Sequence, residues 1–201
     1  LADGYSADAL TLHDESWFEK HHIDLVAGRV KAIDTENKTV ETVDGTSVGY
    51  GRLVLTPGSD PKYPPTIRHH ERGSFFVVRS AKEAEELRKA ARNAKAVLVA
   101  GMGVLALEIT DQLRKMGKTV TVAGAAPQLM PRQLNVRAGE LLEQELSDKK
   151  VRLLFQEEIL SFEQNKKGKW SVSLLKHQGH YDLVVFCIGV TPRVELAKDA
   201  G

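Results

Sequence analysis

Residues 95–108 read Lys-Ala-Val-Leu-Val-Ala-Gly-Met-Gly-Val-Leu-Ala-Leu-Glu and decide the fold of the central part of the chain. The segment from Val97 to Ala100 is a short apolar run of the kind expected for a buried parallel strand. The run breaks into Gly-x-Gly-x-x-Ala, and apolar residues then recur at helical spacing at positions 105, 109, 113 and 116. We therefore predict a strand, a tight glycine turn and a helix in immediate succession, with Gly117 ending the helix.

The three small residues of this turn have separate physical roles. Gly101 permits the tight turn, Gly103 lets the backbone approach a pyrophosphate, and Ala106 lets the helix pack closely on the strand. The helix N-terminus offers free N–H groups and a partial positive charge to an anion. The pattern predicts dinucleotide binding, and the alternative is a turn whose small residues serve packing alone.

One part of the dinucleotide pattern is missing. An acidic residue should end the second strand, about 20 residues after the first glycine, to hold the adenosine ribose hydroxyls. The strand from Thr119 to Val122 instead runs into Ala123-Gly124, and no Asp or Glu occurs between Gln112 and Gly139. That stretch carries five basic residues: Arg114, Lys115, Lys118, Arg132 and Arg137. Two interpretations stay open: the site prefers the 2′-phosphate of NADP(H), or its hold on any nicotinamide cofactor is weakened.

The composition describes an ordinary globular protein. The chain has 201 residues, of which 42% are hydrophobic and 27% charged, and its net charge is +1. This balance gives no electrostatic reason to expect a nucleic acid or a membrane as partner, and no apolar stretch approaches the roughly 20 residues needed to span a bilayer. The lone cysteine, Cys187, favours a reducing, cytoplasmic compartment and is expected to be a small core residue. Because the chain begins at Leu1, we expect it to be an internal segment of a longer protein.

The first third of the chain is predicted from short patterns. We expect a short helix ending at residues 17–22, strands at 23–30, 30–33 and 39–43, and a turn at Asp44-Gly45 before Val48. An apolar run at 52–56 ends at Pro57-Gly58. A proline-rich loop follows at 60–72, and it is the best candidate for a domain boundary.

The remaining patterns alternate between helix and strand. Ser80 and Glu83 form a capping box that opens a helix to about Asn93. Asn135 is expected to cap a helix that reaches Leu146. Strands are predicted at 151–155 and 181–188, and a hairpin or meander at 159–162 and 170–175. This order predicts an α/β fold with a Rossmann-like parallel sheet and a β-meander in three layers, in which the turns at Gly101 and Gly189 face one ligand.

Six segments, in order along nearly the whole chain, resemble those of the two-dinucleotide-fold flavoproteins, the pyridine nucleotide-disulfide oxidoreductases. The likeness is to the NADH oxidase, CoA-disulfide reductase, rubredoxin reductase and assimilatory nitrite reductase branches. Three segments are similar to parts of the flavin domain and of the entry into the nicotinamide domain, and three to the nicotinamide domain and its exit. They are residues 26–34, 50–61, 78–80, 101–108, 126–132 and 187–193.

The chain also departs from the family pattern. It has no initial Gly-x-Gly-x-x-Gly for the ADP half of FAD, no closing Gly-Asp segment, and Gly124 where the acidic residue belongs. The resemblance therefore implies a partial FAD-binding domain at 1–73, an NAD(P)-binding domain at 74–190, and the start of a return to the flavin domain at 191–201.

The resemblance also implies roles for single residues. Gly101 and Gly103 would approach the NAD(P)H pyrophosphate, and Glu108 would sit in the first turn of the helix on the flavin side, unless it only favours the helix N-terminus. Gly189 would close over the nicotinamide. The remaining nucleotide contacts are assigned to Met102, Val104 and Gly124, and the FAD contacts to Val30, Thr56, Gly58 and Arg79. Arg79 as an ordinary surface cation and Gly58 as a turn glycine are the alternatives.

The resemblance implies no catalytic side chain, because the cofactors carry the chemistry. We expect no metal site, since the histidine pairs 21–22 and 69–70 point to different sides and His177 and His180 lie near a turn. The implied function is to align NAD(P)H for hydride transfer to FAD, with an unidentified electron acceptor and the option of a homodimer. The alternative is a non-catalytic or truncated interaction module with a degenerate cofactor site. For the chain alone we expect poor turnover.

Overall fold

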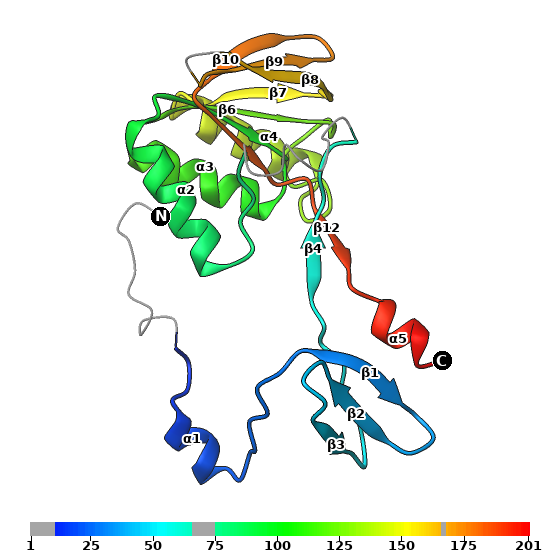
Figure 1. Cartoon of the computed structure of the whole chain (residues 1–201). Coiled ribbons are helices and arrows are strands. Elements are labelled where there is room, and N and C mark those ends of the chain that lie inside the picture. The colour runs from blue at the N-terminus through cyan, green and yellow to red at the C-terminus, as the bar shows by residue number, and fades with distance from the viewer. Residues whose placement is uncertain (1–10, 66–74, 166–167) are drawn as a thin grey trace. The chain divides into compact units, whose positions relative to one another are not determined.

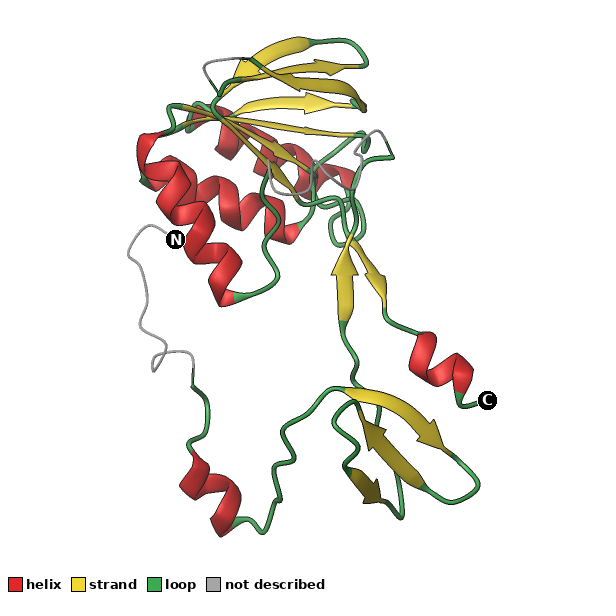
Figure 2. Ribbon diagram, viewed as in Figure 1, coloured by secondary structure: helices red, strands yellow, loops and turns green. Residues whose placement is uncertain are grey.

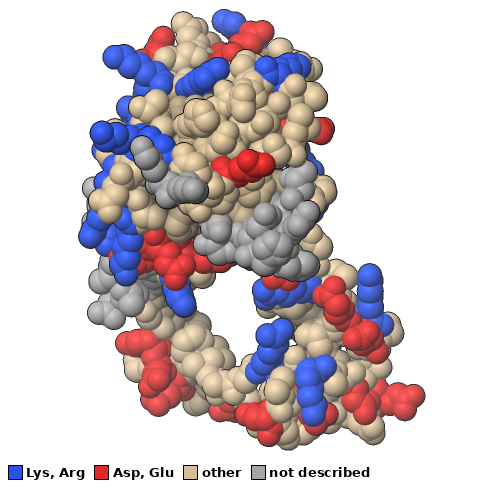
Figure 3. Space-filling view, turned by 45° about the horizontal axis from the view of Figure 1, so that its top comes forward, with Lys and Arg blue, Asp and Glu red and all other residues tan. Residues whose placement is uncertain are grey.

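The computed structural model describes residues 11–65, 75–165 and 168–201. Its contacts divide the chain into two compact units. Among the described residues, those from 61 to 190 belong to unit 1, and those from 11 to 60 together with 191–201 belong to unit 2. Within the described ranges, every helix is too short or too polar to cross a lipid bilayer. On the face shown in Figure 3, lysine and arginine are interspersed with aspartate and glutamate, as the net charge of +1 leads one to expect.

A parallel four-stranded sheet organises unit 1. Its strands are β5 (Ala96–Ala100), β6 (Thr119–Gly124), β7 (Arg152–Phe155) and β11 (Leu183–Phe186), in the order β11-β5-β6-β7. Val97 is paired with Val120 on one side and with Leu183 on the other. Because Val97, Leu98 and Val99 are fully buried, the central strand reads as a continuous apolar run, as predicted.

The sheet of unit 1 lies between a helical layer and an antiparallel layer (Figures 1 and 2). The helices on one face are α2 (Ala81–Asn93), α3 (Val104–Lys115) and α4 (Val136–Asp148). The other face is covered by β8 (Ile159–Gln164), β9 (Trp170–Leu174) and β10 (Gln178–Tyr181). Leu87, Ile109 and Leu129 belong to the core under the helices, whereas Trp170 and Phe186 belong to the core under the antiparallel strands. The three-layer α/β prediction is confirmed.

The helix starts follow the capping residues read from the sequence. The Ser80 hydroxyl accepts a hydrogen bond from the Glu83 amide, and the Glu83 carboxylate accepts one from the Ser80 amide at 2.8 Å. Asn135 caps α4 through a bond from the Ala138 amide to its side-chain oxygen. Both predicted caps are confirmed.

Unit 2 is built from small elements. It contains α1 (Glu15–Lys20), an antiparallel sheet β1-β2-β3 (Val30–Asp34, Thr39–Thr42, Ser47–Gly49), and α5 (Glu195–Asp199), which packs against β1. β4 (Ser59–Pro61) and β12 (Val190–Pro192) form a separate two-stranded sheet.

Two strand predictions need correction. The strand expected at 23–30 is wrong: β1 begins only at Val30, and 23–29 are irregular, because nothing in the described chain pairs with their backbone as a strand. The final strand expected at 181–188 is limited to β11, since Tyr181 belongs to β10. β10 itself was not anticipated, because Gln178, Gly179 and His180 show no apolar alternation.

Hydrogen bonds outside the strand pairing join the neighbouring strands β5 and β11 at both ends. At the amino end, one Asp182 carboxylate oxygen accepts bonds from the amides of Lys95 and Ala96 at 2.8 and 2.9 Å. These two amide bonds hold the pKa of Asp182 below its usual value. At the carboxyl end, the Cys187 amide donates to the Ala100 carbonyl at 2.7 Å.

The carboxyl-end fastening leaves no room for a side chain at Gly101. Its φ is +139°, and a Cβ there would lie 2.3 Å from the Cys187 carbonyl oxygen. Gly101 is thus required by both its backbone conformation and its neighbour.

The buried Glu157 carboxylate links the segment after β7 to the turn between β9 and β10. The Glu157 side chain is fully buried, accepts a bond from the Lys176 amide at 2.9 Å, and lies 2.5 Å from Nδ1 of His177. Burial alone would raise the pKa of Glu157, but the bonds from Lys176 and His177 outweigh it and the pKa falls below its usual value. The carboxylate therefore stabilises the fold at neutral pH.

We predict that Gly101→Ala lowers the free energy of unfolding by at least about 2 kcal/mol, because of its strained φ and the clash with the Cys187 carbonyl. Urea denaturation measures the loss. Gly117→Ala is the matched control: its φ is +74° but nothing lies within 4 Å of its Cβ position, so it should cost only about 1 kcal/mol. Equal losses in both variants would contradict the role of the Cys187 contact.

We predict that Glu157→Gln destabilises the protein by about 1–3 kcal/mol at neutral pH, because the charge that faces His177 is lost. Since the lowered pKa makes the carboxylate's contribution vanish as pH falls, the difference from the parent chain should shrink below the ordinary glutamate value of about pH 4.3. Unfolding curves at several pH values test this. Glu158→Gln, at an exposed position, is the control, and a pH-independent loss in Glu157→Gln would sink the interpretation.

Candidate nucleotide-binding site

The carboxyl edge of the parallel sheet brings together three of the predicted site glycines, Gly101, Gly124 and Gly189. The turn that begins at Gly101 follows β5, Gly124 ends β6, and Gly189 follows β11. Because β11, β5 and β6 are adjacent and parallel, all three turns lie at the same edge. This is the edge at which open α/β sheets bind ligands.

α3 begins shortly after the end of β5, and no side chain caps its amino end. Gly103 is its N-cap, with an extended backbone, and it provides no side-chain hydrogen bond. The first hydrogen bond of the helix runs from the Leu107 amide to the Gly103 carbonyl at 3.2 Å. The amides before Leu107 therefore have no carbonyl partner within the helix. A Cβ built at Gly103 would meet nothing within 4 Å, so the space beside this turn is open. An anion can approach these amides without displacing a side chain.

Glu108 does not lie where the sequence placed it. Since Gly103 is still extended, α3 begins at Val104, and Glu108 is the fifth helical residue rather than part of the first turn. The first turn carries no acidic residue, so the prediction that Glu108 lies there, where it would favour the helix N-terminus, is wrong. Glu108 and Val104 are both exposed.

Met102 lies inside the protein. It is 5% exposed and belongs to the core under the helices. Its Cγ would lie 2.8 Å from a Cβ at Gly124, and its carbonyl accepts a bond from the Met130 amide at 2.8 Å. The Met102 side chain therefore fills the space beside the end of β6. Sequence spacing gives no sign of this contact.

Two reactive groups border the edge without being available for chemistry. Burial raises the pKa of the Cys187 thiol to about 12, which keeps it protonated. The Glu157 amide donates to the Gly124 carbonyl at 3.0 Å, yet the Glu157 carboxylate is buried against Lys176 and His177. Neither is placed as an exposed nucleophile or base.

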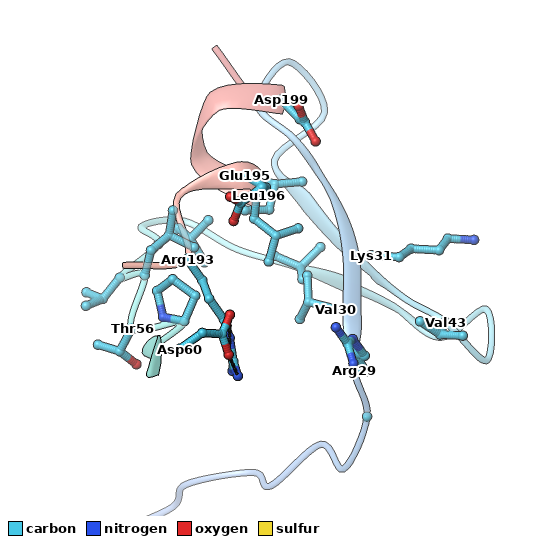
Figure 4. A pocket seen from close by; sticks show the side chains of 17 residues that line it. Arg29, Val30, Lys31, Val43, Thr56, Asp60, Arg193, Glu195, Leu196 and Asp199 are labelled. Carbon is cyan, nitrogen blue, oxygen red and sulfur yellow. Dashed lines mark hydrogen bonds and ion pairs between the residues drawn. The ribbon is translucent and has the colours of Figure 1, made fainter. Parts of the chain in front are cut away.

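Unit 2 holds a pocket of about 910 Å³ (Figure 4). Val30 and Thr56, two of the residues assigned to FAD, line it. Gly58 is outside the lining and has a φ of +78°, and its carbonyl accepts a bond from the Arg193 amide at 3.0 Å. Arg79 belongs to unit 1, where its amide donates to Glu83 just before α2. The lining combines apolar side chains with Arg29, Lys31, Asp60, Arg193, Glu195 and Asp199.

One polar feature of this pocket was missed from the sequence. Arg193 binds the Asp60 carboxylate through two nitrogens, with distances of 2.5 to 3.1 Å (Figure 4). Asp60 raises the pKa of the Arg193 guanidinium. The two residues are 133 positions apart. The one sequence signal that links them is that both lie in segments that resemble the family, residues 50–61 and 187–193.

Within the ranges that the structure covers, no group of three His, Cys, Asp or Glu is arranged to hold a metal ion. His69 and His70 lie outside those ranges. His177 is the partner of Glu157.

The family model for "Pyridine nucleotide-disulphide oxidoreductase" matches residues 4–201. Among curated proteins, the chain is 33% identical over 198 residues to nitrite reductase [NAD(P)H] of Bacillus subtilis, covering 96% of this chain and 24% of that protein. It is also 30% identical to the assimilatory nitrate reductase electron transfer subunit of the same species, covering 98% of this chain and 25% of that protein. The chain therefore spans about a quarter of the length of these relatives.

Among solved structures, the ferredoxin reductase from Rhodopseudomonas palustris is similar with a TM-score of 0.86 at 27% identity, covering 98% of this chain and 48% of that one. The water-forming NADH oxidase from Lactobacillus brevis, bound to NADH, gives 0.75 at 28% identity over 85% of this chain and 38% of the oxidase. An engineered NADPH oxidase derived from it, bound to NADPH, gives 0.83 at 26% over 96% and 44%. With the family model matched almost from end to end, the chain belongs to the pyridine nucleotide-disulphide oxidoreductase family.

Proposed function

We propose that unit 1 binds NAD(P)H at the carboxyl edge of its parallel sheet, as the nicotinamide-binding part of a flavin-dependent oxidoreductase. The observation that carries the proposal is the uncapped amino end of α3, which opens directly off β5 beside open space at Gly103. Free amides and a helix dipole at that point suit a pyrophosphate. The family's dependence on FAD and NAD(P)H supports the same assignment.

The residues present suit the nucleotide in one further respect. A cradle for a diphosphate needs backbone without side chains, and a Cβ at Gly103 would extend into free space that the diphosphate needs. The turn at Gly101 is held in place by the Cys187 backbone rather than by a ligand. The cradle is therefore preformed, so little ordering is needed on binding.

Unit 2 would contribute to the flavin site. Its pocket joins apolar walls to Arg29, whereas Arg193 is paired with Asp60 and Lys31 with Glu41, so we assign the apolar walls to the flavin rings and Arg29 to a phosphate. Bound FAD would accept the hydride from the nicotinamide. The chain's own residues would bind and orient: Val30 and Thr56 would border the flavin nucleotide, and Gly189 would lie near the nicotinamide.

The chain's relatives bind either nicotinamide nucleotide. The engineered oxidase carries five changes, among them a Gly-to-Ala change and, eighteen residues further on, an Asp-to-Ala change. This chain has Ala106 and, at the same eighteen-residue spacing, Gly124. Neither of the two engineered changes to Arg has a counterpart here, since this chain has Ala125 and Pro131 at the same spacings from Gly124. Both NADH and NADPH therefore belong to the proposal, with a separate electron acceptor and a cytoplasmic location supported by the lone cysteine.

A non-catalytic module with a degenerate site is the second candidate. The observation that favours it is the Met102 side chain packed beside Gly124, where a nucleotide-binding relative would be expected to hold the ribose. The two candidates differ in one property that can be measured on this chain, which is its affinity for nicotinamide nucleotides.

We predict that Gly103→Val weakens binding of NADH and NADPH by at least about tenfold, because the new side chain enters the space next to the α3 amides. Nucleotide fluorescence titration or calorimetry measures the affinity. Stability should fall by no more than about 1 kcal/mol, the difference between glycine and valine at an N-cap.

Gly51→Val is the matched control for this variant. Gly51 also has open space at its Cβ position and lies in unit 2, so it should leave nucleotide affinity unchanged. If the parent chain binds neither nucleotide below about millimolar concentration, the second candidate stands and the proposed function is wrong.

A further inference from the structure

A sharp turn after β7 brings the chain back to the end of β6. Gln156 has a φ of +54°, in the left-handed region that residues with a side chain seldom adopt. Its amide donates to the Ala126 carbonyl at 3.2 Å, and the Glu157 amide donates to the Gly124 carbonyl at 3.0 Å. Ala125, between these two carbonyls, is exposed. The backbone at the end of β6 is therefore held by the two residues that follow β7.

The turn after β7 is itself held by the Glu157 side chain. The carboxylate is fully buried, accepts a bond from the Lys176 amide at 2.9 Å, and lies 2.5 Å from Nδ1 of His177. Lys176 also donates from Nζ to the side-chain oxygen of Gln156 at 3.4 Å. A strained backbone persists only where its surroundings fix it. Here the fixing contacts come from the turn between β9 and β10.

A buried carboxylate is a costly way to fill space. An apolar side chain would occupy the same position without the desolvation of a charge. What the carboxylate adds is direction, because its partners fix residue 157 from the side-chain end while the amide of the same residue is bonded to Gly124. The antiparallel layer is thereby connected to the end of β6 through one residue.

We propose that Glu157 is a positioning residue of the nucleotide site, which holds residues 124–126 in the conformation that receives the adenosine ribose. Its buried carboxylate is not a ligand and acts through the backbone bond to Gly124. The proposal rests on the proposed function, in which the ribose meets the end of β6. It applies to NADH and NADPH alike.

The first test measures binding by Glu157→Ala and Glu157→Gln. Calorimetric titration uses NADH and 5′-ADP, since the latter carries the adenosine and the diphosphate without the nicotinamide. Glu157→Ala should weaken both ligands by the same factor, at least about tenfold. Glu157→Gln keeps an acceptor for the Lys176 amide and should recover part of the affinity. Loss of NADH affinity with 5′-ADP unaffected, or no loss for either ligand, contradicts the proposal.

Val151→Ala is the matched control for general destabilisation. Val151 is 5% exposed and directly precedes β7, so it lies at the amino edge of the sheet, opposite to the nucleotide edge. The truncation removes buried methyl groups and lowers the unfolding temperature, yet both affinities should stay within about twofold of the parent values. Thermal unfolding shows that each variant is folded at the titration temperature, and Glu157→Gln carries the comparison where Glu157→Ala is not. Equal losses of affinity in the control and in the Glu157 variant overturn the proposal.

Amide hydrogen exchange separates the proposal from the proposed function, because it needs no nucleotide. In the Glu157 variants the amides of residues 156 and 157 should exchange faster than in the parent chain, while those of β5 keep their protection. Faster exchange together with weaker 5′-ADP binding supports the proposal. Unchanged exchange, or faster exchange with unchanged affinity, refutes it and leaves the proposed function intact. If the parent chain binds neither NADH nor 5′-ADP, the proposed function fails and the positioning role fails with it.

Discussion

The fastening of β5 to β11 is the constraint on which the rest of unit 1 depends. Asp182 holds the two strands together at their amino ends, and the Cys187 amide bonds Ala100 at their carboxyl ends. The second contact brings the Cys187 carbonyl so close to residue 101 that only glycine fits. The chain turns at this glycine, and α3 begins three residues later at Val104. The open, uncapped helix end follows from strand packing rather than from any requirement of a ligand.

The same region shows a core residue bordering a binding edge. Met102 lies between the two glycines of the turn, yet its side chain is packed in the core together with Leu129, and its carbonyl anchors the loop after β6. A change at this position would affect the helical core, the loop and the end of β6 together. Changes at Gly103 would not, because nothing packs against it. A substitution at position 103 should therefore cost little stability, whereas one at position 102 or 124 also disturbs the core.

Much of unit 1 could be predicted because its signals are local. The Ser80 and Asn135 caps, the apolar runs of β5 and β6 and the helical spacing after Gly103 each lie within a few residues, and all are confirmed. The failures have a common cause. β10 and the irregular segment at 23–29 depend on which strands find partners, and the Arg193–Asp60 pair joins distant positions. Glu108 was placed one turn too early because the sequence does not show that Gly103 is extended and that α3 already begins at Val104.

The candidate site was predicted in outline but not in the detail of its packing. The absence of an acid at Gly124 is visible in the sequence, and it left two interpretations: a preference for the 2′-phosphate or a weakened site. The contact between Met102 and Gly124 adds a packing feature at the end of β6 that the sequence does not reveal. The side chain fills space beside the ribose position and leaves the diphosphate cradle at Gly103 open. In the proposed function the diphosphate meets the amides of α3 and the ribose meets the end of β6, so loss of the acid need not weaken binding of the diphosphate. The missing acid at Gly124 is therefore compatible with a site that still binds a diphosphate.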